Sequence, residues 1–293
     1  MSVPLGKLVR VACAQIAPRI ADPTTNRELV REAIIGAVAS NADVIVLPEL
    51  ATTGYYMTSG EARALAEPVE GPSVSTWIQA LSGSEAVVIG GFCEVGAGDK
   101  PYNSAALVSG QGVLAVYRKA HLWAEEPLLF AVGSVMPPVV ETRFGRIGVG
   151  ICYDLFFPEV TRSLALRGAQ LLALPTNSPW DKPREVGAIN TVDGIGHVVA
   201  RSAAYLNRVF VAVCDRHGDE RGHAWTARSS IIGPEGDFRA GPVSYESAAI
   251  YADCDLQDAD QKIWVGTKND ALADRRPELY EDLARRGPRT SGD

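Results

Sequence analysis

The sequence of 293 residues predicts an α/β fold with mixed β-sheets. Short apolar runs typical of strands alternate with segments whose apolar residues recur at helical spacing. Four strand-like runs between residues 86 and 152 follow one another without a helix, so some strands must be antiparallel. Composition does not change before Gly266, and we therefore expect one main domain over residues 1–265 and a charged tail over 266–293.

Each expected strand is a short run rich in valine, isoleucine and leucine that turn residues interrupt. Pro18 stops the first run, and the turn at 110–112 joins two runs into a hairpin. The strands expected in this way are 8–17, 42–47, 86–95, 102–109, 112–117, a run that ends on Cys152, 169–175, 208–214, 228–233 and 248–254.

The expected helices combine apolar residues at helical spacing with start and stop signals. Thr24 or Thr25 can cap the first helix, and Gly168 ends the third. The helices expected in this way are 26–40, 73–82, 159–167, 187–207, which contains two glycines after the one that begins it, and a short tail helix over 277–285.

Composition excludes several classes of protein. The apolar content of 46% and the charged content of 22% are those of an ordinary globular protein, and a net charge of −7 argues against affinity for nucleic acid or an anionic membrane. No apolar run is long enough to span a membrane, and the first seven residues lack the features of a signal peptide, so a cytoplasmic location is expected.

Cysteines and histidines are scattered along the chain. Their spacing matches neither a disulfide framework nor a set of metal ligands, so we expect no metal site and no cofactor. Four of the cysteines lie in strand-like runs, where packing explains them. The residues concerned are Cys13, Cys93, Cys152, Cys214 and Cys254, with His121, His197, His217 and His223.

Cys152 differs from the other cysteines because it lies at a turn between a strand and a helix. The run before it is broken by Gly148 and Gly150, and Pro158-Glu159 opens the next helix. Functional groups of α/β proteins gather at the carboxyl ends of strands, where backbone N–H groups can face a developing negative charge. A buried structural cysteine is the alternative interpretation. The turn favours a nucleophile.

Glu49 and Lys119 also follow directly on strand-like runs. A carboxylate at the dry rim of a sheet has a raised pKa and can act as a general base, although an ordinary loop glutamate remains the alternative. An ammonium beside a thiol lowers the thiol pKa and can stabilise an oxyanion, although Lys119 can equally be an exposed edge charge.

Taken together, these three strand ends resemble the motifs of the nitrilase superfamily, the carbon-nitrogen hydrolases. Residues 48–49, 117–123 and 150–159 correspond in order to the three motifs of that family. The resemblance implies an α-β-β-α sandwich, with Cys152 as nucleophile, Glu49 as general base and Lys119 stabilising the tetrahedral intermediate. It also implies a second glutamate shortly after the lysine, and Glu126 fits that spacing better than Glu125.

The residues after the cysteine indicate the branch of the superfamily. Nitrilases usually have Trp-Glu there, whereas this chain has Tyr153-Asp154, which is similar to the amidases. The resemblance therefore implies hydrolysis of a small carboxylic amide to acid and ammonia through a thioester. Enzymes acting on N-carbamoyl amino acids, nitrile hydrolases and acyltransferases are the alternatives, and a non-catalytic relative is disfavoured because the three residues are present.

Aromatic residues near the predicted strand ends are candidates for the wall of a substrate pocket, although aromatic side chains also pack in protein cores. The N–H of Tyr153 is a further candidate oxyanion donor. The tail 266–293 is similar to tails that cross dimer interfaces in the superfamily, which implies a homodimer or a larger homo-oligomer. The four candidate wall residues are Tyr55, Trp123, Tyr153 and Trp180.

Overall fold

Two six-stranded mixed sheets form the centre of the computed structural model, which describes residues 8–179, 195–243 and 246–285. In the first sheet β1, β2 and β3 are parallel, β14 pairs antiparallel with β1, and β4 and β5 continue the sheet beyond β3 as antiparallel strands. In order across the sheet, the strands are β14 (Ala248–Cys254), β1 (Val9–Gln15), β2 (Val44–Val46), β3 (Val87–Glu94), β4 (Tyr102–Ser109) and β5 (Gly112–Arg118).

The second sheet repeats this arrangement, although the sequence shows no internal repeat. Its central strands β7, β8 and β9 are parallel, with β6 antiparallel on one side and β12 and β13 antiparallel on the other. A separate two-stranded hairpin consists of β10 (Asp219–Glu220) and β11 (His223–Ala224). In order, the strands of the sheet are β13 (Phe238–Ala240), β12 (Ser230–Ile232), β9 (Phe210–Cys214), β8 (Leu171–Pro175), β7 (Gly145–Val149) and β6 (Val139–Thr142).

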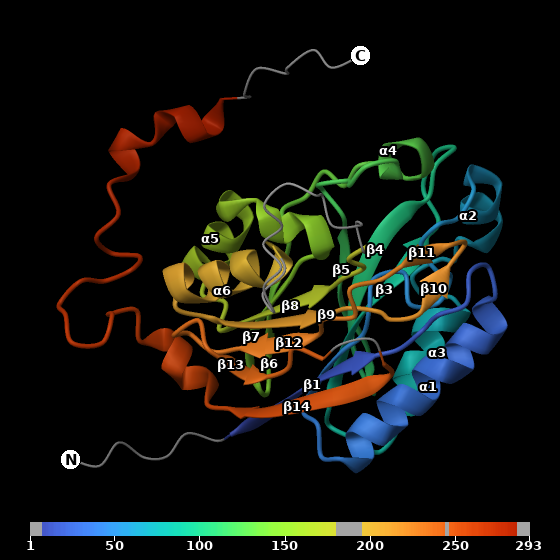
Figure 1. The fold of residues 1–293 in the computed structure, drawn as a ribbon, viewed down its shortest axis with the longest axis horizontal. Coiled ribbons are helices and arrows are strands. Elements are labelled where there is room, and N and C mark those ends of the chain that lie inside the picture. The colour runs from blue at the N-terminus through green and yellow to red at the C-terminus, as the bar shows by residue number, and fades with distance from the viewer. Residues whose placement is uncertain (1–7, 180–194, 244–245, 286–293) are drawn as a thin grey trace.

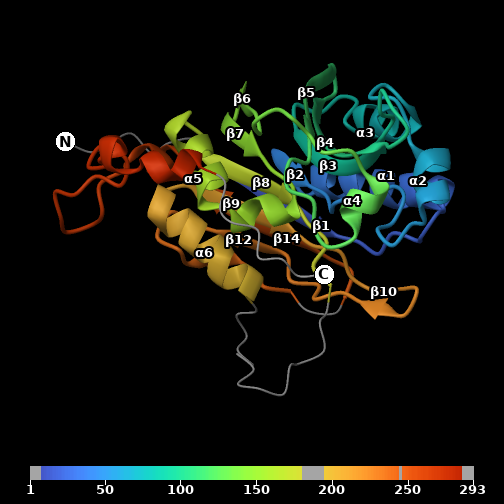
Figure 2. The same cartoon turned by 90° about the horizontal axis from the view of Figure 1, so that it is seen from above.

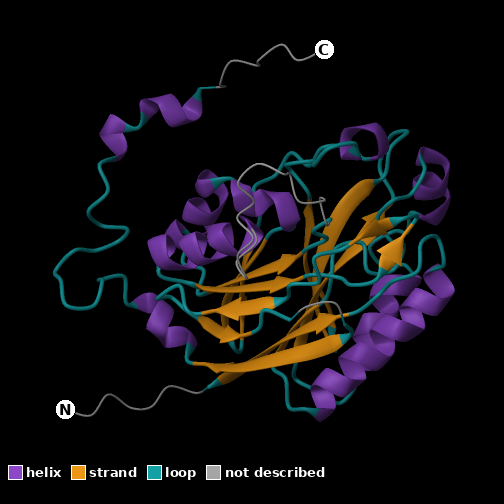
Figure 3. Cartoon of the chain, viewed as in Figure 1, coloured by secondary structure: helices purple, strands orange, loops and turns teal. Residues whose placement is uncertain are grey.

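Helices cover the outer face of each sheet, which completes an α-β-β-α sandwich (Figures 1, 2 and 3). The helices α1 and α3 pack on the first sheet, and α5 and α6 pack on the second. The α-helices are α1 (Pro23–Ala39), α2 (Ser59–Leu65), α3 (Pro72–Ala80), α4 (Glu126–Leu129), α5 (Pro158–Leu166) and α6 (Ile195–Asn207). The 3₁₀ helices are η1 (Cys152–Phe156), η2 (Leu256–Asp260), η3 (Pro277–Leu279) and η4 (Glu281–Ala284).

Alternation along the strands divides the apolar residues between three cores. In β1, Val11 and Cys13 face the core between the sheets, whereas Ala12 and Ala14 face α1 and α3. All four are buried, as expected for strands covered on both faces. The four-layer architecture implied by the resemblance is therefore confirmed.

The strand expected to end on Cys152 ends earlier, at Val149. Cys152 instead begins η1 with a φ of +44°, in the left-handed region, which is incompatible with a strand. The cysteine therefore lies on a tight turn beyond the end of the strand, which stops three residues earlier than the sequence pattern suggests.

Other differences concern caps and short elements. The N-cap of α1 is Asp22, whose carboxylate accepts the N–H of Thr25 at 3.1 Å, because Pro23 occupies the first helical position. Neither threonine is the cap. The short elements α2, α4, β6, β10, β11 and β13 were not expected, since runs of two to seven residues carry too little periodicity to be recognised.

The end of the chain leaves the body of the protein, as Figure 1 shows for the segment in red. Where a helix over 277–285 was expected, the structure has only η3 and η4, and neither contains a buried residue. A short helix without a buried face lacks tertiary support. The first part of the expected helix 187–207 and residues 286–293 of the tail lie outside the described residues.

Replacing Gly91 with alanine is expected to destabilise the protein and disturb the turn after β2. A Cβ on Gly91, in β3, would lie 2.6 Å from the Cα of Glu49. The backbone at Glu49 would have to move to make room for it. Overpacking of this kind typically costs about 1–3 kcal/mol of the free energy of unfolding. Thermal or urea unfolding of Gly91→Ala measures it.

Gly36→Ala is the matched control, because a Cβ there meets nothing within 4 Å and the residue lies on an exposed face of α1. Alanine at this position is expected to stabilise the protein by roughly 0.5–1 kcal/mol. Equal unfolding curves for the two variants would contradict the close approach of β3 to the Glu49 turn.

Candidate active site

Residues that follow β2, β5, β7 and β8 gather at one edge of the sandwich. Glu49 follows β2, Lys119 follows β5, Cys152 lies on the turn after β7, and Asn177 follows β8. The side chains of Glu49 and Lys119 are fully buried, and Cys152 is partly exposed. The first sheet thus supplies the carboxylate and the ammonium, and the second sheet supplies the thiol.

Lys119 lies between two carboxylates. Its Nζ is 2.6 Å from Oε1 of Glu49 and 2.9 Å from Oε1 of Glu126. Oε2 of Glu126 accepts the backbone N–H of Trp123 at 2.7 Å, which holds this carboxylate in the turn that follows Lys119. Glu126 rather than Glu125 therefore contacts the lysine, in agreement with the spacing argument.

Burial dominates the electrostatics of the site. It raises the pKa of Glu49 to about 7, against the opposing effect of the Lys119 charge. Burial alone would lower the pKa of Lys119, but Glu49 and Glu126 together raise it, so the lysine stays charged. The cluster contains two carboxyl groups for one ammonium, and the pKa of Glu49 lies near neutral pH.

The Cys152 thiol has a pKa well above its ordinary value. Burial is the main cause, and the charge of Glu49 adds to it, whereas Lys119 acts in the opposite direction. Lys119 thus lowers the thiol pKa as expected, but burial and the Glu49 charge outweigh the ammonium, so the pKa is raised overall. The resting thiol is protonated and needs a base.

Asp154 holds the turn that carries Cys152. Its Oδ2 accepts the N–H of Ile151 at 3.0 Å and the hydroxyl of Tyr117 at 2.9 Å. The Tyr117 oxygen in turn accepts the N–H of Ala120 at 3.0 Å, next to Lys119. The buried Asp154 therefore links the nucleophile turn of one sheet to the lysine turn of the other.

Two asparagines at the site were not assigned a role from the sequence. Asn103, in β4, donates through Nδ2 to Oε1 of Glu49 at 2.7 Å and lies 3.2 Å from Oε1 of Glu126. The side-chain Nδ2 of Asn177 donates to the backbone oxygen of Glu49 at 2.8 Å. The backbone oxygen of Asn177 lies 3.6 Å from the Cys152 sulfur. The sequence signal for Asn103 is a polar residue at the start of a buried apolar strand, next to the strand that ends at Lys119.

The predicted wall residues fall into three cases. Trp123 and Tyr153 contact each other edge to face, with ring centroids 4.7 Å apart, so the lysine and cysteine turns share an aromatic surface. Burial raises the pKa of Tyr55, and the charges of Glu126 and Glu49 act in the same direction. Its ring contacts Trp225 edge to face, with ring centroids 5.4 Å apart. Trp180 lies outside the described residues.

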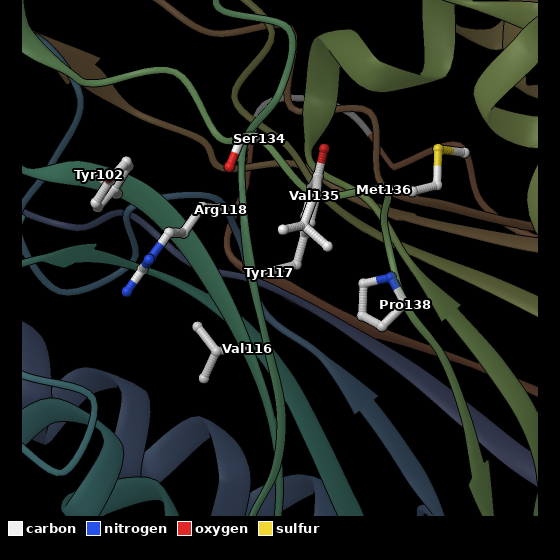
Figure 4. A pocket seen from close by; sticks show the side chains of 8 residues that line it. All are labelled: Tyr102, Val116, Tyr117, Arg118, Ser134, Val135, Met136 and Pro138. Carbon is white, nitrogen blue, oxygen red and sulfur yellow. The ribbon is translucent and has the colours of Figure 1, made fainter.

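A cavity between β5 and the segment before β6 is separate from this site (Figure 4). None of Glu49, Lys119, Glu126 or Cys152 borders it. Its one charged residue, Arg118, pairs with Glu94 at 2.6 Å. The residues that line the cavity are Tyr102, Val116, Tyr117, Arg118, Ser134, Val135, Met136 and Pro138.

Within residues 8–179, 195–243 and 246–285, no three histidine, cysteine, aspartate or glutamate side chains are grouped as metal ligands. None of the helices described there has the length and apolar character needed to cross a membrane.

Known proteins share both the sequence pattern and the fold. Residues 10–263 match the carbon-nitrogen hydrolase family. A nitrilase from Pyrococcus abyssi is 31% identical over 275 residues, which cover 93% of this chain and 99% of that protein. An N-carbamoylputrescine amidase from Solanum lycopersicum is 30% identical over 297 aligned positions, which cover 94% of this chain and 95% of that protein.

A solved structure extends the similarity to an amidase. It is a mutant of the amidase from Nesterenkonia sp. AN1 showing covalent addition of the acetamide moiety of fluoroacetamide at the active site cysteine, with a TM-score of 0.76 and 25% identity over 96% of this chain and 99% of that one. By its family match, its relatives and its fold, the chain belongs to the carbon-nitrogen hydrolases of the nitrilase superfamily.

Proposed function

We propose that this hydrolase converts small carboxylic amides to the acid and ammonia through a thioester on Cys152. The observation that carries the proposal is the buried cluster in which one ammonium serves two carboxylates beside a protonated thiol. Such a site holds a nucleophile, a base whose pKa is about 7 and a fixed positive charge, and these are the groups that amide hydrolysis requires.

The first half of the proposed reaction forms the thioester. Glu49 takes the thiol proton as the Cys152 sulfur attacks the carbonyl carbon, and the carbonyl oxygen becomes an oxyanion. The Lys119 ammonium and the N–H of Tyr153 stabilise that oxyanion. When the oxyanion collapses, the C–N bond breaks and Glu49 gives its proton to the leaving nitrogen, which departs as ammonia.

The second half returns the enzyme to its resting state. Glu49 removes a proton from water, and the hydroxide attacks the thioester carbonyl. Collapse of this second oxyanion breaks the C–S bond, the acid leaves, and the sulfur regains its proton from Glu49. Glu126 holds the ammonium in place throughout, since its Oε1 lies 2.9 Å from Nζ of Lys119.

Two observations favour an amide over the alternative substrates. Tyr153-Asp154 follows the nucleophile where nitrilases usually have Trp-Glu, and the fold matches an amidase over most of both chains. The similarity to an N-carbamoylputrescine amidase keeps N-carbamoyl compounds as the second candidate class, because their C–N bond needs the same nucleophile and base.

We also propose that the tail beyond residue 265 packs against a second copy of the chain. In this tail Leu279 and Leu283 are 66% and 60% exposed in the single chain. Apolar side chains presented along an extended segment are typical of an interface that another protein covers. A homodimer or a larger homo-oligomer would bury them.

Cys152→Ala is expected to abolish ammonia release from small aliphatic and aromatic amides, because no other group can form the thioester. The panel should include nitriles and N-carbamoyl amino acids, with ammonia measured by a coupled assay. Cys254→Ala is the matched control, since Cys254 is a buried cysteine of β14 outside the site, and it should keep activity.

Three results of this panel would contradict the proposal. Activity that survives in Cys152→Ala would remove the thioester mechanism. Turnover confined to nitriles or to N-carbamoyl compounds would move the chain to another branch. A higher yield of hydroxamate than of acid when hydroxylamine is added in moderate amounts would indicate an acyltransferase.

The pH dependence of kcat/KM is expected to have an acid limb with an apparent pKa near 7. Glu49, whose pKa burial raises to about 7, must be ionised to accept the thiol proton, so activity rises as the pH passes through this value and is lost below it. Glu49→Gln should lower kcat/KM by about 10²–10⁴-fold and remove the limb. An acid limb near pH 4, the ordinary range of an exposed glutamate, would contradict a buried base.

A further inference from the structure

The buried amide of Asn103 lies between the two carboxylates of the site. The residue is fully buried in β4, and its Nδ2 is 2.7 Å from Oε1 of Glu49 and 3.2 Å from Oε1 of Glu126. An amide carries two N–H donors, so it can satisfy one oxygen of each carboxylate at the same time. Asn103 is also bonded to Lys119, because its backbone carbonyl accepts the backbone N–H of Lys119 at 2.9 Å.

The donors are distributed unequally over the two oxygens of Glu49. Oε1 receives both Nζ of Lys119 at 2.6 Å and Nδ2 of Asn103 at 2.7 Å. Oε2 is buried and has no hydrogen-bond partner among the residues that the structure describes. One oxygen is therefore held by two fixed donors, and the other remains available to a proton.

Asn103 itself is left incompletely paired by this arrangement. Its Oδ1 is buried without a partner in the described part of the chain. An unpaired buried carbonyl oxygen is unfavourable for folding, and an apolar residue of similar shape would avoid it. The residue is therefore explained better by the charge cluster than by the stability of β4.

We propose that Asn103 is a positioning residue of the hydrolase, which holds Oε1 of Glu49 so that the unshared Oε2 serves as the proton acceptor for the thiol. The inference rests on the proposed function, in which Glu49 is the base. Asn103 contacts neither the thiol nor the carbonyl in this scheme and acts only through Glu49 and Glu126. Its hydrogen bond also lowers the pKa of Glu49, in opposition to burial.

Asn103→Leu tests the proposal, because leucine is close to asparagine in size and has no donor. The variant should lower kcat by about 10–100-fold with a small change in KM, since a misoriented base slows proton transfer more than binding. The acid limb of kcat/KM should move to higher pH by roughly half a unit to one unit, because ionised Glu49 loses a hydrogen bond.

Ser104→Ala is the matched control. Ser104 is the next residue of β4, is equally buried, and donates from Oγ to Oε2 of Glu94 at 2.6 Å, outside the site. This variant also loses a buried hydrogen bond to a carboxylate and is expected to unfold at a lower temperature. Its acid limb should stay where the wild type has it. A limb that moves equally in both variants, or in neither, would overturn the role of Asn103.

Two further variants cover the case in which Asn103→Leu does not fold. Asn103→Ser keeps one hydroxyl donor, so its acid limb should move in the same direction by a smaller amount. Asn103→Asp replaces the amide donor by a third carboxyl group, and should move the acid limb further to higher pH than Asn103→Leu does. An unshifted limb in the serine and aspartate variants would also overturn the proposal.

A measurement without substrate separates this inference from the proposed function. The rate at which iodoacetamide alkylates Cys152 reports proton removal from the thiol, and its pH dependence should move to higher pH in Asn103→Leu but not in Ser104→Ala. Wild type that alkylates in this way yet hydrolyses no amide would contradict the proposed substrate and leave Asn103 supported. Wild type that hydrolyses amides while both variants alkylate alike would remove only the role of Asn103.

Discussion

The contact on which the site depends is the single buried ammonium shared by Glu49 and Glu126. Buried charges are strongly unfavourable unless they are paired and hydrogen-bonded, and Lys119 lies within 2.9 Å of both carboxylates. One positive charge cannot fully compensate two negative ones among side chains that are this deeply buried. Burial is the main reason why the pKa of Glu49 is raised to about 7 although a lysine lies beside it, and the charge of Glu126 adds to the effect.

The sandwich makes this cluster possible because its two sheets present equivalent strand ends to each other. The turn after β2 carries Glu49, and the turn after β8 carries Asn177, which donates to the Glu49 carbonyl at 2.8 Å. Asp154 makes the second connection, from the Cys152 turn to Tyr117 of β5. Hydrogen bonds that cross between the two sheets thus hold the turns that carry the site residues. The orientation of these side chains therefore does not depend on a single loop.

The sequence predicts the parts of this arrangement that local patterns encode. Strand-end positions and ordered motifs identify Glu49, Lys119 and Cys152, and spacing favours Glu126. Asn103 escapes such reasoning because its role arises from the pairing of β4 with β3 and β5, which no local window contains. The direction in which the pKa of the Cys152 thiol shifts cannot be predicted from the sequence either, because it is set by burial and by the neighbouring carboxylate. Elements of two or three residues such as β10 are also missed, because they are too short to show a periodic pattern and form only through tertiary contacts.

The raised pKa of the thiol restricts the way in which this hydrolase can act. A preformed thiolate would add a further negative charge to a cluster that already holds two carboxylates for one ammonium, and burial opposes that. In the proposed mechanism the proton therefore leaves the sulfur as the substrate carbonyl is attacked, and the new negative charge appears on the carbonyl oxygen, where the Lys119 ammonium can stabilise it. Glu49 suits that task because its pKa of about 7 lets it both accept and return a proton near neutral pH. Burial thus both keeps the resting thiol protonated and raises the pKa of the carboxylate that accepts its proton.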